Sequence, residues 1–218
     1  MTPLDPDLNA LPAHLPIFPL TGVLLLPRGE LPLNIFEPRY LNMTEDALAG
    51  SRMIGMIQPL DQGSGESEPP VYKTGCAGRI VAFQETEDGR FLITLKGICR
   101  FHVQEELAST RGYRPAIPDW TPYANDLHDE GSATVDREKL LGSLKSYFKL
   151  HNISADWDAI EASTDERLVT CLSMICPFEA PEKQALLEAP TLTERSQILT
   201  TLVEMAVLAK SQGCAEPQ

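Results

Sequence analysis

The chain has 218 residues, of which 43% are hydrophobic and 22% are charged. This composition is typical of a globular protein with a sizeable apolar core. The formal net charge is −13, and both halves are acidic: residues 1–112 carry nine basic and 14 acidic side chains, and residues 113–218 carry nine and 17. Because neither half is basic, phosphate neutralisation cannot drive binding, and we expect no nucleic-acid partner and no membrane partner.

The five cysteines fit neither a disulfide framework nor a metal site. Their number is odd, and no pair has the Cys-x-x-Cys spacing of a zinc or redox motif. We expect free thiols in a reducing compartment, buried in every case except Cys214. The four histidines are scattered along the chain. We therefore expect no metal and no cofactor.

The amino-terminal residues do not resemble a targeting or membrane segment. Residues 1–14 are rich in proline and polar groups, which predicts a flexible tail. They lack the charged-then-apolar order of a signal peptide, and the apolar run at residues 23–26 is too short to cross a bilayer. We therefore expect a cytoplasmic protein.

Residues 15–112 predict a β-rich subdomain, in which apolar runs are separated by glycine, proline and acidic stretches. Residues 38–49 predict its one helix, because Pro38 suits a first helical turn. Residues 60–70 have the composition of a mobile acidic loop. The glycine of residues 87–90 favours a hairpin turn.

The hairpin is followed by an alternating apolar pattern. Phe91, Ile93 and Leu95 share one face of a predicted strand, because side chains alternate between the two faces. We expect residues 91–96 and 98–105 to be two paired strands that meet at Gly97.

Residues 113–131 contain three prolines and predict an irregular linker. After it the apolar spacing changes from 2 to about 3.6 residues, which indicates helices. Residues 132–211 therefore predict a helical bundle subdomain. The residues expected to face its interior in the later helices are Leu168, Leu172, Ile175, Ile198, Leu202, Met205 and Leu208.

Three sequence patterns carry a family resemblance. The first is the pair of proline-interrupted runs at residues 15–20 and 31–40. The second comprises residues 75–83 and 92–103, and the third is the run at 182–188 with Arg195 after it. In this order, the three patterns resemble the amino-terminal, substrate-binding domain of Lon proteases, over about residues 15–207.

The resemblance implies an α+β fold, in which a twisted, partly closed β-barrel of the PUA-like kind carries one helix and is followed by a helical bundle. The sequence lacks the Gly-x-x-x-x-Gly-Lys-Ser/Thr phosphate loop and the serine–lysine segment of a full-length Lon. We therefore expect a free-standing, bacterial-type copy of the domain that is not an enzyme.

The function implied is the binding of protein or peptide clients, including unfolded segments, as an adaptor or regulator in protein quality control. An open strand edge and exposed apolar side chains would serve this purpose. Two alternatives stay open: an enzyme with an unrecognised Cys or His site, and an RNA-binding PUA-like module. The candidate peptide-binding residues are Phe18, Leu20, Leu33, Ile35, Phe36, Glu37, Arg39 and Tyr40.

Overall fold

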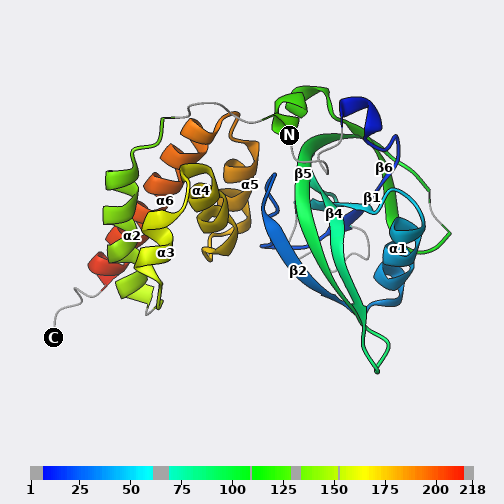
Figure 1. Ribbon diagram of the computed structural model, residues 1–218, viewed down its shortest axis with the longest axis horizontal. Coiled ribbons are helices and arrows are strands. Elements are labelled where there is room, and N and C mark those ends of the chain that lie inside the picture. The colour runs from blue at the N-terminus through cyan, green and yellow to red at the C-terminus, as the bar shows by residue number, and fades with distance from the viewer. Residues whose placement is uncertain (1–6, 61–68, 109, 129–133, 152, 214–218) are drawn as a thin grey trace. The chain divides into compact units, whose positions relative to one another are not determined.

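The computed structural model describes residues 7–60, 69–108, 110–128, 134–151 and 153–213. The chain divides into two compact units, Met1–Asp129 and Glu130–Gln218, and each is described by itself. The first holds the sheet, and the second consists of helices (Figure 1). The α+β class predicted from the sequence is therefore confirmed.

The first unit is built on a mixed sheet with the strand order β2-β5-β4-β3-β1-β6. Strand β6 also pairs with β5, so five of the strands form a ring and β2 lies outside it as an edge strand. The expected partly closed barrel is thus a sheet that closes through β5 rather than a regular barrel. The strands are β1 (Leu15–Pro19), β2 (Glu30–Ile35), β3 (Met53–Ile57), β4 (Thr74–Glu85), β5 (Phe91–Glu106) and β6 (Arg114–Asp119).

Strand β5 corrects the prediction of two paired strands joined at Gly97. Residues 91–106 form one long strand, which pairs with β4 along its length, with β2 at its beginning and with β6 at its end. Both backbone groups of Gly97 bond to the segment at residues 28–29: the N–H donates to Gly29 O, and the carbonyl accepts from Arg28 N, both at 2.8 Å. A glycine that looked like a turn in the sequence marks a close backbone approach within a strand.

The interior of the ring is packed with apolar side chains. A cluster of buried residues around Phe101 includes Leu15, Ile17 and Met53. Gly55 and Gly75 lie directly against the Phe101 ring, where a Cβ would come within 3.0 Å of ring atoms. The Phe101 ring therefore fits in the interior only because glycines occupy these positions of β3 and β4.

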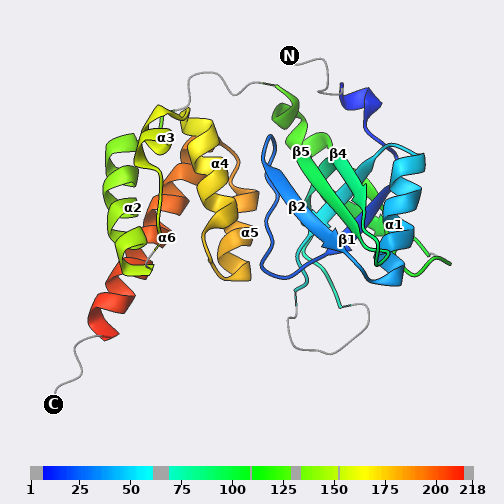
Figure 2. The same cartoon turned by 60° about the horizontal axis from the view of Figure 1, so that its bottom comes forward.

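A second layer covers one face of the sheet beside the ring. The loop residues Leu24, Leu25 and Leu26 are almost completely buried. A Cβ at Gly78 would lie 2.7 Å from Leu25 and 2.9 Å from Leu95, so this loop packs on the face that carries Leu95. Helix α1 (Pro38–Ala49), predicted with the same boundaries, packs against β1 and β3 (Figure 2).

Two segments expected to be irregular contain ordered elements. The predicted linker, residues 113–131, includes strand β6 and the short helix η2 (Thr121–Leu127), because the prolines of β6 occupy positions that its pairing tolerates. The predicted tail includes the turn η1 (Leu8–Ala10), and Trp120 Nε1 donates to Pro12 O at 3.2 Å. Residues 1–6, and residues 61–68 of the predicted acidic loop, lie outside the described part.

The second unit contains five helices in its described residues, and α6 packs against α2, α4 and α5. Side chains cap the beginning of two of them: Asp156 accepts from Ala159 N, and Thr164 accepts from Arg167 N. None of the described helices is both long and apolar enough to span a membrane. The helices are α2 (Arg137–His151), α3 (Trp157–Ala162), α4 (Asp165–Ile175), α5 (Ala180–Glu188) and α6 (Leu192–Gly213).

The predicted inner face of the later helices is partly wrong. Ile175 is 68% exposed, and Met205 and Leu208 are each 59% exposed. Helix α6 instead buries Leu192, Leu199 and Val203. Apolar residues occur around much of this helix, so periodicity alone could not distinguish the two faces.

The close approach at Gly97 generates a stability prediction. In Gly97→Ala, the new Cβ collides with the backbone carbonyl of Leu26, and we expect a loss of about 2–3 kcal/mol in unfolding free energy. The measurement is urea unfolding followed by Trp120 fluorescence, in a background where Trp157 is replaced by Phe.

The matched control is Gly142→Ala in α2, where nothing lies within 4 Å of the added Cβ. Circular dichroism should show that this change preserves or raises stability, by up to about 1 kcal/mol. A Gly97→Ala protein as stable as the parent would contradict the role given to this glycine.

Candidate functional site

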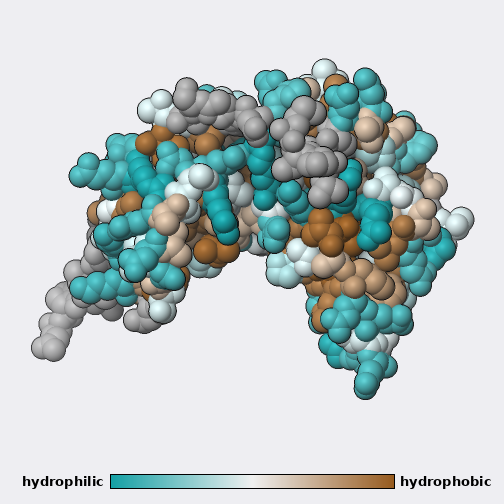
Figure 3. Space-filling view, viewed as in Figure 1, coloured by the Kyte–Doolittle hydropathy of each residue, from teal (hydrophilic) through white to brown (hydrophobic). Residues whose placement is uncertain are grey.

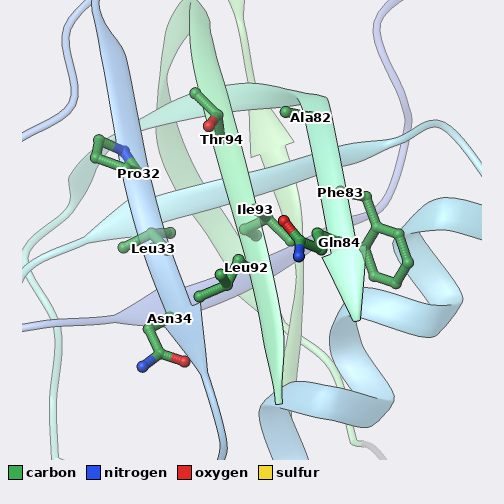
Figure 4. Close-up of a pocket in the computed structure, with 9 residues that line it drawn as sticks. All are labelled: Pro32, Leu33, Asn34, Ala82, Phe83, Gln84, Leu92, Ile93 and Thr94. Atoms are coloured by element: carbon green, nitrogen blue, oxygen red, sulfur yellow. The ribbon is translucent and has the colours of Figure 1, made fainter. Parts of the chain in front are cut away.

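The described residues form a pocket of about 480 Å³ on three neighbouring strands of the sheet unit. Figure 4 shows Leu92 of β5 between Asn34 of β2 and Gln84 of β4, with Pro32, Thr94 and Ala82 in the adjacent row. The pocket therefore extends across the three strands. Its lining residues are Pro32, Leu33, Asn34, Ala82, Phe83, Gln84, Leu92, Ile93 and Thr94.

The two faces of the sheet differ sharply at this point. Phe91, Ile93 and Leu95 are at most 8% exposed and form the covered face, as the alternating pattern predicted. Leu92, in contrast, is 40% exposed. The opposite face, called the open face below, carries Pro32, Asn34, Arg79, Ala82, Gln84, Leu92, Thr94 and Lys96.

Other large apolar side chains near this pocket are also exposed. Besides Leu92, Val81 is 48% exposed, and Phe36, directly after β2, is 62% exposed. Phe83 is 42% exposed, but it pairs with Ile93 and contacts the Phe91 ring, so it belongs to the covered face. Figure 3 shows hydrophobic surface over β4 and β5 in the sheet unit. Large apolar residues that are exposed in a cluster are typical of binding surfaces, whereas single exposed apolar residues are common on any protein surface.

Strand β2 also offers an unpaired backbone edge, since among the described residues it pairs only with β5. Gly97 N donates to Gly29 O, so by alternation residues 31, 33 and 35 direct their hydrogen-bonding groups towards β5. Pro32 points its nitrogen away from β5, where the missing N–H costs no ladder bond. The outer edge therefore presents the backbone groups of Glu30 and Asn34 and the carbonyl of Pro32.

Three of the eight candidate residues from the sequence are core residues. Phe18, Ile35 and Tyr40 are at most 7% exposed. The rings of Phe18 and Tyr40 have their centroids 4.2 Å apart, and burial raises the pKa of the Tyr40 hydroxyl. The contact between Phe18 and Tyr40 joins α1 to β1.

Among the other candidates, only Leu33 lines the pocket, while Leu20 is partly exposed and Phe36 is exposed. Glu37 is the residue before α1, but its side chain caps no backbone donor and instead pairs with Arg39 at 2.9 Å. Arg39 in turn lies over the Tyr40 ring, 4.5 Å from its centroid. Leu92 of β5, which the sequence prediction missed, interrupts an otherwise polar row of the strand.

A buried polar cluster lies between β5 and η2. Arg100 and Asp126 form two side-chain hydrogen bonds of 2.9 and 2.7 Å, and both side chains are less than 5% exposed. Burial lowers the pKa of Arg100, but the hydrogen bond and charge of Asp126 outweigh it and raise that pKa overall. Tyr123 packs beneath the guanidinium at 4.4 Å. This cluster attaches η2 to the sheet, and its charges are neutralised internally.

The thiols differ in exposure and in pKa. Cys76, Cys99 and Cys176 are buried, but Cys171 is exposed, which corrects the expectation that it is buried. Burial raises the pKa of Cys99 to about 12 and that of Cys176 to about 11. Within the described ranges, no three His, Cys, Asp or Glu side chains are placed to hold a metal ion.

Comparison with protein families matches residues 14–205 to the ATP-dependent protease La (LON) substrate-binding domain. The chain belongs to this family. The match covers the substrate-binding region of Lon and neither its ATPase nor its protease module.

Lon proteases are the curated relatives of this chain. The Lon protease of Flavobacterium johnsoniae is 28% identical over 201 residues, which cover 90% of this chain and 24% of the relative. That of Dictyoglomus thermophilum is 23% identical over 197 residues, covering 87% and 24%. The chain thus spans about a quarter of the length of these relatives.

Two solved structures show the same fold. A Lon N-terminal domain protein from Xanthomonas campestris aligns with a TM-score of 0.59 and 23% identity, covering 86% of this chain and 97% of that one. The N-terminal domain of a Mycobacterium avium complex Lon protease aligns with a TM-score of 0.58 and 15% identity, covering 87% and 97%. The fold implied by the resemblance is confirmed, while its PUA-like classification stays a prediction.

The buried ion pair generates a second stability prediction. Removing the carboxylate in Asp126→Ala leaves the Arg100 charge buried without its counter-ion, and we expect a loss of about 3–5 kcal/mol in unfolding free energy. The double variant Arg100→Met/Asp126→Leu should recover most of this loss, because no buried charge is left. Urea unfolding monitored by Trp120 fluorescence measures both changes, and equal losses in the two variants would contradict the explanation.

Thiol reactivity provides a third prediction, and it tests the alternative of a cysteine enzyme. In a Cys214→Ser background at pH 8, we expect Ellman's reagent to modify Cys171 rapidly and the other thiols only after unfolding. The raised pKa values leave Cys99 and Cys176 with almost no thiolate at that pH. The control Cys171→Ser should abolish the fast phase. A second fast thiol in the native protein would favour the enzyme alternative.

Proposed function

We propose that this chain is a non-catalytic module that binds extended polypeptide segments on the open face of β2, β5 and β4. The observation that carries the proposal is the partly exposed Leu92 at the centre of an apolar pocket, beside an unpaired strand edge. A peptide can add to such an edge through its backbone while alternate side chains enter the pocket. This mode recognises unfolded chains without requiring a fixed sequence.

The candidate residues take graded roles in this proposal. Leu33 forms part of the pocket wall, and Phe36 offers exposed apolar surface at the end of β2. Leu20, Glu37 and Arg39 are proposed to contribute to the rim. Phe18, Ile35 and Tyr40, being buried, are proposed to hold the rim in position from below.

The biological role proposed is that of an adaptor or regulator in protein quality control. Membership of the Lon substrate-binding family supports it, because the relatives that share this region are proteases. The free thiols of Cys76, Cys99, Cys171 and Cys176 support a reducing, cytoplasmic location. The buried Arg100–Asp126 pair and the buried thiols offer no exposed activated group, which supports a non-catalytic role.

A binding experiment tests the site. The probe is a fluorescently labelled 12-residue peptide in which Leu or Phe alternates with Ser or Thr and no residue is charged. We expect the full chain to bind it and Leu92→Ser to weaken binding about tenfold, because the loss of one apolar contact is worth about 1–2 kcal/mol. Fluorescence anisotropy measures the affinity.

The matched control is Ile175→Ser, which removes an equally large side chain that is 68% exposed on α4. Binding should be unchanged in this variant. If Ile175→Ser weakens binding as much as Leu92→Ser, or if neither affects it, the pocket is not the binding site. If the full chain fails to bind the peptide at all, the proposed function is wrong.

A further inference from the structure

Two positive charges occupy the open face next to the pocket. Arg79 of β4 pairs with Lys96 of β5, so their side chains project from the same face, and Lys96 alternates with Thr94 and Leu92 along β5. Both cations are partly exposed. They lie one row beyond the pocket, at the end nearer to Gly97.

These cations have no partner within the part of the chain that the structure describes. Among the described residues, neither the Lys96 ammonium nor the Arg79 guanidinium forms a hydrogen bond or an ion pair, and the enclosed Nε of Arg79 has no acceptor. Five other arginines of the same unit form ion pairs: Arg39 with Glu37, Arg90 with Asp88, Arg100 with Asp126, Arg111 with Glu45, and Arg114 with Glu106. Arg52 and Lys73 of this unit also form no ion pair among the described residues, but Arg79 and Lys96 are the two such cations that share a row of the open face, in a chain with a formal charge of −13.

Acidic groups near the open face do not cancel this charge. Glu30 pairs with Lys96 in the strand register, yet it is exposed and makes no ion pair with it. Glu85 pairs with Phe91 and so belongs to the row of the covered face. The side chains of the row Glu30–Lys96–Arg79 thus carry one negative and two positive charges.

The spacing of the strand relates these charges to the pocket. Leu92 and Lys96 are four residues apart on β5, which is about 13 Å at roughly 3.3 Å per residue. Thr94, in the adjacent row of the pocket, is two residues from Lys96, or about 7 Å. An extended ligand that runs along the strands has the same rise per residue. Two of its side chains that are two or four residues apart would therefore point to the same side, one into the pocket and the other towards the cations.

We propose that the open face selects extended polypeptide segments in which an apolar side chain lies two or four residues from an Asp or Glu. The apolar side chain occupies the pocket around Leu92, and the carboxylate contacts Lys96 and Arg79. This inference rests on the proposed function and adds a substrate class to it. The net negative charge of the chain would favour basic clients at long range. Salt screens charges that lie more than about 10 Å away, so Lys96 and Arg79 determine the preference of a segment bound beside them.

Four peptides test the selectivity with the full chain. The first is an uncharged peptide with one Leu, and the others place Asp four residues from that Leu, Asp three residues from it, or Lys four residues from it. We expect the peptide with Asp at four residues to bind about fivefold more tightly than the uncharged one, which is the upper range for a partly exposed ion pair. The peptide with Asp at three residues should show no gain, and the one with Lys should bind more weakly.

Variants assign the gain to its residues. Lys96→Gln should remove most of the fivefold gain while leaving the affinity for the uncharged peptide unchanged, and Arg79→Gln should act in the same direction. The matched control is Lys149→Gln, since Lys149 is an exposed lysine on α2 and should not alter any affinity. Raising the salt from about 0.05 M to about 0.5 M should also abolish the gain, since exposed charges are screened.

The outcomes separate the two proposals. If the uncharged peptide binds but Asp gives no gain at any position, the charge selectivity is wrong and the proposed function stands. Equal gains at three and four residues, or a gain that survives in Lys96→Gln, would also overturn the selectivity. If no peptide binds, both proposals fail. If the chain instead self-associates with a concentration-dependent mass that the Lys96→Gln change abolishes, a second copy occupies the face and the inference is overturned.

Discussion

The long strand β5 is the element on which the rest of the sheet unit depends. Its second half closes the ring with β4 and β6, whereas its first half supports β2 and leaves one face of the sheet uncovered. The two halves meet at Gly97, where the segment at residues 26–29 packs directly on the strand backbone. A side chain at this position would push that segment away from β5. The layer formed by Leu24, Leu25 and Leu26 would then lose its packing against the sheet. A single close approach thus determines which face is covered and which is left open.

Polar groups show the same division between structure and surface. Asp126 neutralises Arg100 within the sheet unit and fixes η2 against β5. Lys96 lies on β5 and Arg79 on the neighbouring strand β4, and their side chains have no such partner in the described chain. Removing water from a charge costs free energy unless a partner compensates for it. Arg100, which is buried and paired with Asp126, therefore has a structural role. We propose that the cations without a partner contact a ligand that brings its own carboxylate.

The sequence predicted the elements better than their partners. The helix at residues 38–49 and the buried face of Phe91, Ile93 and Leu95 follow from local rules, and both are found. Gly97 was interpreted as a turn, because its requirement comes from a distant backbone segment that local patterns do not reveal. Met205 and Leu208 were placed inside, because apolar residues occur around much of α6 and only the packing partners select a face.

The candidate site shows the same limit. The resemblance to the Lon family directed attention to residues 15–40, where the proline-interrupted motif is distinctive, but Phe18, Ile35 and Tyr40 of that motif are buried. Leu33 is the candidate that lines the pocket, and its neighbours there come from β4 and β5. Leu92 could have been noticed as a large apolar residue on the polar side of an alternating strand. That Leu92 lines a pocket becomes clear only from the structure, which places β2 and β4 on either side of it.

The central claim is that the open face of β2, β5 and β4 is where the chain holds other polypeptides. The most direct measurement is a titration of the ¹⁵N-labelled full chain with the uncharged peptide, followed by amide chemical shifts. The account predicts that the changes concentrate in residues 30–36, 79–85 and 91–97. Changes concentrated in residues 137–213, or none at a saturating peptide concentration, would contradict it.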